Sequence, residues 1–220
     1  MIALLVVITF LAAVLIDHLL HRQPIPVTAE APKEAPRPRL IPSIVAGFAV
    51  PDHLRYHPGH TWAVSETPER VRVGIDDFAA KLGGEVTRID IPERGQWIRQ
   101  GQRIIAMHHG DRELDLVSPV EGTIVDFNEK ALDDPKLAQN DPYGDGWLLV
   151  VNAPDTKTSF RNLLGGTIAR RWMEDAAAKL RAFATPSVAM AQDGGVAVNN
   201  VIDTLPDADW NQLTKDLFLA

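Results

Sequence analysis

The sequence predicts a mainly β fold, a small barrel or sandwich that is followed by a helix. Between residues 55 and 152, short runs rich in β-branched residues are separated at close spacing by Gly, Pro and Asp, which is typical of small all-β domains. Residues 159–183 instead repeat apolar side chains every three to four positions, which predicts a helix with one buried stripe. The expected strands include residues 61–64, 70–75, 85–91 and 102–108.

An N-terminal transmembrane helix is expected over residues 1–22. Residues 2–16 are apolar apart from Thr9, and Leu19 and Leu20 extend the run towards the ~20 residues that cross a bilayer. The positive-inside rule then places the rest of the chain in the cytoplasm, as a single-pass protein of the inner or plasma membrane. The charges that decide this orientation all follow the run: Arg22, Lys33, Arg37 and Arg39. A cleaved signal and a buried helix are the alternatives.

The next expected parts are a Pro-rich linker over residues 23–43 and one domain over residues 44–183. Proline-rich composition favours an extended, semi-rigid spacer. Residues 44–50 form either a first strand or a lead-in. Asp76 is a candidate N-cap for a short helix over residues 76–82, which Gly83 and Gly84 would end. Gly165 and Gly166 are expected to break the later helix, whose stripe is Leu163, Leu164, Ile168, Trp172, Ala176 and Leu180.

The C-terminal part is expected to be a flexible linker, residues 184–205, and an amphipathic tail, residues 206–220. Trp210, Leu213, Leu217 and Phe218 fall on one face of a helix in this tail. They would dock either into a groove of a partner protein or back onto the chain's own barrel. Docking on a membrane surface is disfavoured, because Asp residues outnumber Lys on the polar side.

Composition excludes several classes of function. The formal net charge of −7 argues against nucleic acid as the main partner. The chain has no cysteine, so disulfides, thiolate metal sites and cysteine nucleophiles are excluded. No nucleophile elbow and no Gly-rich phosphate loop before a helix is found. We therefore expect neither enzymatic activity nor a bound cofactor.

A β-hairpin is predicted with its turn at Gly110 and Asp111. Apolar residues lie on both sides of this pair, and Gly in the first position of a two-residue loop suits a type II′ turn. Asp111 would therefore lie at the tip of the hairpin.

Several ordered motifs around this hairpin resemble the glycine cleavage system H protein family. The resemblance spans about residues 56–180 and implies the barrel-sandwich hybrid of lipoyl and biotinyl domains, followed by a helix. It also implies that the tip surface docks against partner enzymes. The matching motifs are Tyr56-His57-Pro58-Gly59-His60-Thr61-Trp62, Val73–Ala79, Gly84-Glu85-Val86, Ile91-Pro92, Ser118–Gly122, Asn128-Glu129, Leu132–Pro135, Leu137, Asn140–Gly144 and Gly146-Trp147-Leu148.

The resemblance fails at the tip. Members of the family carry a lipoylated lysine there, in the motif Glu-Ser-Val-Lys-Ala, and this arm carries an aminomethyl group between enzymes. Aligned without a gap from Gly101 to Gly122, Asp111 falls on the lysine position, and a carboxylate cannot form the amide that holds lipoate. Lys81, Lys130 and Lys136 have no such hairpin around them. The five residues at the motif's positions are His108, His109, Gly110, Asp111 and Arg112, and they form the predicted interaction surface.

Three polar groups contain residue types that can bind a metal, and a non-metal role is the favoured interpretation of each: a solvated turn, structural hydrogen bonds and a solvated loop. His108, His109, Asp111 and Glu113 gather near the tip, but adjacent residues of a strand point to opposite faces. His57 and His60 are expected to make structural hydrogen bonds. A predicted acidic loop with Asp133, Asp134, Asp141 and Asp145 lacks the spacing of an EF-hand.

The favoured hypothesis is a membrane-anchored, non-lipoylated H-protein-like module that acts as an adapter or accessory subunit of a membrane-associated complex. Its protein partners are not identified by the sequence. One alternative is a lipoyl carrier of the glycine cleavage system. The other is a module that binds a metal or a small ligand at the tip.

Overall fold

The computed structural model describes residues 43–183 and 207–218. Within these residues, no helix is long and apolar enough to cross a membrane. The predicted anchor, residues 1–22, lies outside them, as do nearly all of the Pro-rich linker and the whole of the segment 184–205.

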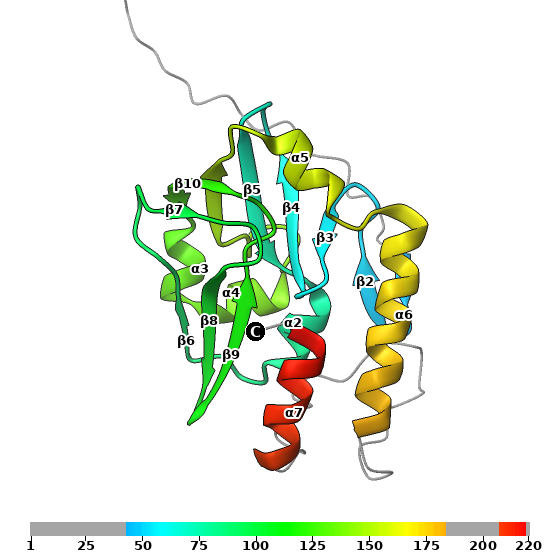
Figure 1. The fold of residues 1–220 in the computed structure, drawn as a ribbon. Coiled ribbons are helices and arrows are strands. Elements are labelled where there is room, and N and C mark those ends of the chain that lie inside the picture. The colour runs from blue at the N-terminus through cyan, green and yellow to red at the C-terminus, as the bar shows by residue number, and fades with distance from the viewer. Residues whose placement is uncertain (1–42, 184–206, 219–220) are drawn as a thin grey trace, which may run out of the picture. The chain divides into compact units, whose positions relative to one another are not determined.

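Eleven strands form three antiparallel sheets in the described part of the chain (Figure 1). The first is the hairpin of β1 (Ser43–Val45) and β2 (Phe48–Val50). The second has six strands and the third has three, and the third contains the predicted hairpin. The six-stranded order is β3 (Arg55–His57), β4 (Thr61–Ser65), β5 (Arg70–Ile75), β11 (Leu149–Asn152), β10 (Gly122–Phe127) and β7 (Trp97–Ile98). The three-stranded order is β6 (Arg88–Asp90), β8 (Arg103–His109) and β9 (Arg112–Val117).

The prediction of a mainly β domain is confirmed, and one predicted strand is too long. Residues 70–75 form β5 as expected, whereas the strand predicted over residues 85–91 is reduced to β6, residues 88–90. Gly84 has φ +66°, which turns the chain just before this segment. The backbone N–H of Val86 then donates to Oε1 of Gln139 at 3.1 Å instead of to a neighbouring strand.

The core lies between the sheets and is built around Trp62 of β4. This side chain is 1% exposed, and its indole N–H donates to the carbonyl of Pro142 at 3.0 Å. Gly74, its cross-strand partner on β5, leaves room for the ring. A Cβ atom at this position would lie 2.6 Å from Cζ2 of Trp62. Glycine is therefore required here by close packing.

Helix α2 (Asp77–Leu82) begins and ends where the sequence predicts. The Asp76 carboxylate accepts from the backbone N–H of Ala79 at 2.8 Å, as an N-cap does. Gly83 is the C-cap. The predicted acidic loop is wrong in part, because its residues also form two short helices. These are α3 (Glu129–Asp133) and α4 (Pro135–Asn140), and Asp134 caps α4 by accepting from the N–H of Lys136.

The later helical region is broken near Gly165, as predicted, into α5 (Thr156–Arg161) and α6 (Gly166–Phe183). The predicted stripe of α6 is wrong at Ile168, which is 65% exposed. Ala176 and Leu180 are buried, as predicted. The rest of the buried face of α6 consists of Ala169, Met173 and Ala177, whose side chains are small or adaptable in shape.

The last described element is α7 (Asp207–Phe218), which packs against β9 and α6 (Figure 1). The four predicted anchor side chains are all buried in the chain itself. Their exposed fractions are 4% for Trp210, 0% for Leu213, 4% for Leu217 and 0% for Phe218. Of the two arrangements that the sequence left open for the tail, the structure has the one in which it folds back on its own domain.

Candidate docking surface at the hairpin tip

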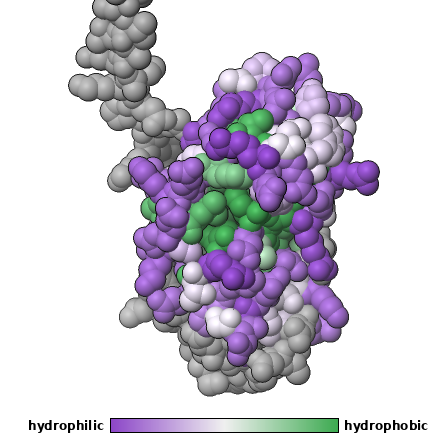
Figure 2. All heavy atoms as spheres, turned by 90° about the vertical axis from the view of Figure 1, so that its left-hand side faces the viewer, coloured by the Kyte–Doolittle hydropathy of each residue, from purple (hydrophilic) through white to green (hydrophobic). Residues whose placement is uncertain are grey.

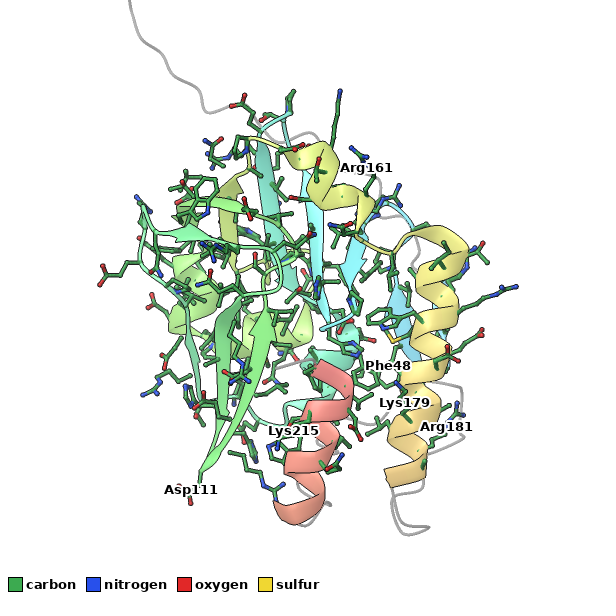
Figure 3. The ribbon with its side chains drawn as sticks, viewed as in Figure 1. Phe48, Asp111, Arg161, Lys179, Arg181 and Lys215 are labelled. Carbon is green, nitrogen blue, oxygen red and sulfur yellow. The ribbon has the colours of Figure 1, made fainter. Side chains whose placement is uncertain are left out.

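The β8–β9 hairpin ends in a two-residue turn. His109 pairs with Arg112, so Gly110 and Asp111 alone make the connection. Gly110 has φ +57°, whereas Asp111 is not among the residues with positive φ, and this combination agrees with the predicted type II′ turn. Figure 3 shows Asp111 at the free end of the hairpin.

The stem of the hairpin is fixed by its apolar face. Met107 pairs with Leu114 across the two strands, and both side chains are at most 2% exposed. Because side chains alternate along a strand, this buried pair sets which of the tip residues face solvent and which face the domain.

The outer face of the hairpin carries a histidine among charged side chains of both signs. His108 lies between Arg88 of β6 and Glu113 of β9 in the sheet register. Its Nε2 is 2.9 Å from the Asp90 carboxylate, and its Nδ1 is 3.7 Å from the Glu113 carboxylate. Arg88 also pairs with Asp90 at 2.9 Å. The side chain of His108 is only 18% exposed, but its partners are more than half exposed. Ion pairs with exposed partners contribute little to stability, so these pairs define a polar surface rather than a structural bond.

The inner face of the hairpin carries His109 and Arg112. Nδ1 of His109 is 2.8 Å from the backbone carbonyl of Glu85. The guanidinium of Arg112 lies over the ring of Trp210 at 6.0 Å from its centroid. The tip is therefore held on its inner side by the loop before β6 and by helix α7.

The two adjacent histidines lie on opposite faces of the hairpin, so they do not converge on one point. Among residues 43–183 and 207–218, no group of three His, Asp or Glu side chains is placed to hold a metal ion. The four Asp residues of the predicted acidic loop form no such group either: Asp133, Asp134, Asp141 and Asp145. This geometry gives the metal hypothesis no support.

No lysine lies on the hairpin. Lys81 of α2 pairs with Asp77 at 2.7 Å and also donates to the carbonyl of Gly47. Lys130 lies in α3, and Lys136 of α4 pairs with Glu85 at 2.8 Å. In Figure 3 the tip ends in the carboxylate of Asp111.

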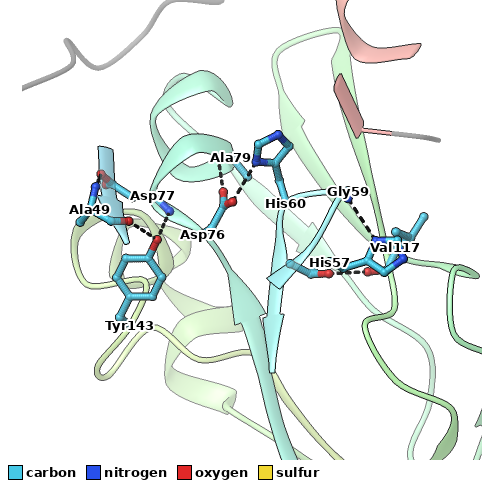
Figure 4. Close-up of polar contacts among 10 residues, drawn as sticks. Ala49, His57, Gly59, His60, Asp76, Asp77, Ala79, Val117 and Tyr143 are labelled. Carbon is cyan, nitrogen blue, oxygen red and sulfur yellow. Dashed lines mark hydrogen bonds and ion pairs between the residues drawn. The ribbon is translucent and has the colours of Figure 1, made fainter. Parts of the chain in front are cut away.

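A buried polar network lies behind the hairpin (Figure 4). Nδ1 of His60 is 2.8 Å from the Asp76 carboxylate, and both side chains are buried. The hydroxyl of Thr61 donates to the carbonyl of Val117 in β9 at 2.8 Å, which ties β4 to the hairpin. His60 has φ +63°, an unusual conformation for a residue other than Gly. The predicted structural role of His60 is thus explained by its bond to the N-cap of α2.

Neighbouring groups of this network have shifted pKa values. Burial, and then the nearby His60, lower the pKa of His57, whose Nδ1 accepts from the N–H of Gly59 at 3.0 Å. Burial, and then the charge of Asp76, raise the pKa of Tyr143. The Tyr143 hydroxyl donates to the carbonyl of Ala49 and accepts from the N–H of Asp77, so it joins β2 to α2.

The sequence alone did not reveal that His60 lies under the C-terminal helix. Its ring stacks on Phe78 with 4.2 Å between centroids and lies 4.9 Å from the ring of Phe218. The ring of Trp172 in α6 lies on a third side of His60, with 4.6 Å between the ring centroids. An aromatic at the end of the tail was visible in the sequence, but nothing local indicated its partner.

Comparisons with known proteins agree with this geometry. Residues 54–176 match the family model described as "Glycine cleavage H-protein". The chain is 38% identical over 106 residues to the glycine cleavage system H protein of Bifidobacterium longum, covering 48% of this chain and 77% of that protein. It is 35% identical over 117 residues to the protein of the same name from Prochlorococcus marinus strain NATL2A, covering 53% of this chain and 90% of the relative.

A solved structure is also similar. The glycine cleavage system H protein of Mycobacterium marinum matches with a TM-score of 0.50 and 30% identity, over 57% of this chain and 98% of that one. The family match ends at residue 176, so the end of α6 and the whole of α7 lie beyond it. On the matched residues and the mainly β fold, this chain belongs to the glycine cleavage H-protein family.

Proposed function

We propose that this chain is a non-lipoylated docking module of the H-protein family, which acts as an adapter or accessory subunit of a membrane-associated complex. The observation that carries the proposal is Asp111 at the turn of the β8–β9 hairpin. An amide to lipoate needs the amine of a lysine, and a carboxylate offers none. The fold of the carrier is kept, while the group that would carry is replaced.

The assignment of Asp111 to the lysine position rests on spacing. The segment from Gly101 to Gly122 aligns with the family without a gap, and the motif residues Ser118 and Pro119 resume just after the hairpin. The two-residue turn agrees with this spacing, because an insertion or deletion in the hairpin would change the loop or the register.

The tip surface has the properties of a polar docking site. It presents His108, Asp111 and Glu113 on a hairpin whose stem is held by the buried pair of Met107 and Leu114. Charged surfaces of this kind steer association and select partners more than they add affinity. A partner protein with a complementary charge pattern is therefore the expected ligand. No residue of this surface is assigned a catalytic role.

Membrane anchoring is part of the same proposal. The apolar run of residues 2–20 would hold the chain at the bilayer, and the Pro-rich residues 23–43 would set the distance of the domain from it. Carbonate extraction tests this part: the full chain should stay in the membrane fraction, and a chain that starts at residue 23 should be released. Release of the full chain would refute anchoring.

A second candidate function is favoured by the relatives, whose names identify them as glycine cleavage system H proteins. On this alternative the chain would be a lipoyl carrier for an aminomethyl group, as the resemblance implies. It would need a modified lysine away from the turn. Lys81 is poorly suited, because its ammonium is paired with Asp77 and only 14% of its side chain is exposed.

Site-specific crosslinking tests the docking role. A photoreactive amino acid replaces Asp111 at the tip in one full-length chain and Asp175, on the exposed side of α6, in a matched control. Membrane extracts in mild detergent are irradiated, and the crosslinked proteins are identified by mass spectrometry. The proposal predicts a defined partner that is crosslinked from the tip and not from α6. Crosslinks to glycine cleavage enzymes would instead support the carrier, and identical products from both positions would refute a docking site at the tip.

A further inference from the structure

Helix α7 covers the inner face of the hairpin and the buried His60. Its two ends make different contacts: Trp210, near its start, lies against Arg112 of the hairpin, and Phe218, its last residue, lies against His60 and Phe78. Between them Leu213 and Leu217 are buried. Figure 1 shows α7 beside the β8–β9 hairpin and below α2.

The approach of α7 is close at one point of the domain. A Cβ atom at Gly59 would lie 2.8 Å from the carbonyl oxygen of Phe218 and 2.7 Å from Cγ2 of Val117. Because Gly59 has no side chain, the end of α7 fits between the β3–β4 turn and β9.

The ring of His60 lies against Phe218, and one of its two nitrogens has no hydrogen-bond partner within the described residues. Its Nδ1 lies 2.8 Å from the Asp76 carboxylate, which can only accept, so Nδ1 donates in this bond. Nε2 is buried and has no hydrogen-bond partner within the described residues. A buried polar atom without a partner is costly, and removal of Phe218 would open one side of the His60 ring to groups from outside.

Two features set α7 apart from the rest of the core. It lies beyond the family match, which ends at residue 176, and the 23 residues 184–206 join it to α6. Its 12 residues are also too few to form a stable helix alone in water, so α7 depends on the groove that it fills.

We propose that the inner side of the hairpin is a helix-binding groove, closed in cis by α7 and open to an amphipathic partner helix when α7 leaves. The groove comprises the inner face of β9, Gly59, His60 and the adjacent side of α6. Its ligand is a helix of the α7 type, with an aromatic anchor followed by two leucines and a second aromatic at the end. A groove of this kind could exist in the chain with or without lipoate on a lysine elsewhere.

Chemical modification of His60 in the full-length chain tests the proposal. Diethyl pyrocarbonate reacts with accessible imidazoles, and peptide mapping reads each histidine separately, with the exposed His53 as an internal reference. The variant Trp210→Ala loosens α7 at the hairpin end, about 12 Å along the helix from Phe218, and leaves the aromatic neighbours of His60 unchanged. Gln212→Ala, on the exposed side of α7, is the matched control.

If α7 closes the groove, modification of His60 should be slow in the wild-type chain and in Gln212→Ala. Loss of a buried aromatic raises the open population by about a hundredfold or more, so His60 should react faster by that factor in Trp210→Ala. The amides of α7 should lose protection from hydrogen exchange in this variant, while those of β4 and β5 keep theirs. A synthetic peptide of residues 206–220 should slow the reaction of His60 again, and a peptide with Trp210→Ala should not.

Three results would overturn the inference. If His60 becomes reactive and the α7 amides lose protection only together with the amides of β4 and β5, then α7 is an inseparable part of the core. An unchanged rate of His60 modification in Trp210→Ala would show that α7 does not close the groove from its hairpin end. Failure of the wild-type peptide to protect His60 in that variant would show that the opened groove does not bind a helix.

Discussion

Replacing Asp76 by Ala removes the acceptor of two hydrogen bonds inside the domain. One Asp76 oxygen accepts from the N–H of Ala79 and caps α2, and the other accepts from Nδ1 of His60, each at 2.8 Å. Asp76 and His60 are both 0% exposed, so water does not reach either bond in the native state. The substitution should therefore lower the free energy of unfolding.

The two contributions can be estimated separately. Loss of an N-cap costs about 0.5–2 kcal/mol. A buried donor left without an acceptor costs about 1–3 kcal/mol more. The Nδ1–H of His60 would be such a donor, and the other ring nitrogen, Nε2, already has no partner within the described residues. Together these give a loss of roughly 1.5–5 kcal/mol, with the lower end reached if the site relaxes.

Urea denaturation of the full-length chain measures this loss, followed by tryptophan fluorescence and read as a change in midpoint at constant slope. Asp155→Ala is the control, because Asp155 caps α5 through Thr158 at the surface and contacts no buried histidine. Asp76→Asn should recover part of the loss, since Asn is a good N-cap. A loss below about 1 kcal/mol in Asp76→Ala, or one no larger than in Asp155→Ala, would refute the reasoning.

Three further predictions concern packing, pH and the tip. Gly74→Ala should destabilise the domain by about 1–3 kcal/mol through overpacking against Trp62, and an unchanged thermal midpoint would contradict this. The lowered pKa of His57 means that the unfolded chain binds a proton more readily, so stability should fall as pH drops below about 6.5. His57→Gln should weaken this dependence, and equal pH slopes in variant and wild type would show that His57 does not cause it. Asp111→Lys should leave the urea midpoint unchanged because the turn is exposed, and a large shift would show that Asp111 is structural.

The features that sequence reasoning predicted correctly are local ones. Asp76 as an N-cap, Gly83 as a stop and Gly110 in a two-residue turn each depend on backbone geometry within a few residues. The strand over residues 70–75 follows from alternation and β-branched composition. The order of the motifs indicated the H-protein family, and the alignment with that family led us to expect Asp111 at the lysine position.

The features that it missed depend on contacts distant in sequence. β6 is short because Val86 bonds to Gln139, 53 residues away. Ile168 is exposed because the domain packs against the next face of α6, and no periodic pattern distinguishes two adjacent apolar faces. The place of α7 depends on Gly59 and His60, about 150 residues before it, and an amphipathic pattern does not identify the surface that a helix will cover.

The most direct test of the central claim is the intact mass of the full-length chain, purified from cells that lipoylate their own carrier proteins. The account predicts a single species without lipoate, because the hairpin turn offers a carboxylate in place of an amine. An Asp111→Lys chain measured in parallel shows whether the lipoate ligase of those cells can recognise and modify a lysine on this hairpin. A wild-type mass increased by one lipoyl group, mapped to any lysine, would contradict the account and establish the carrier function.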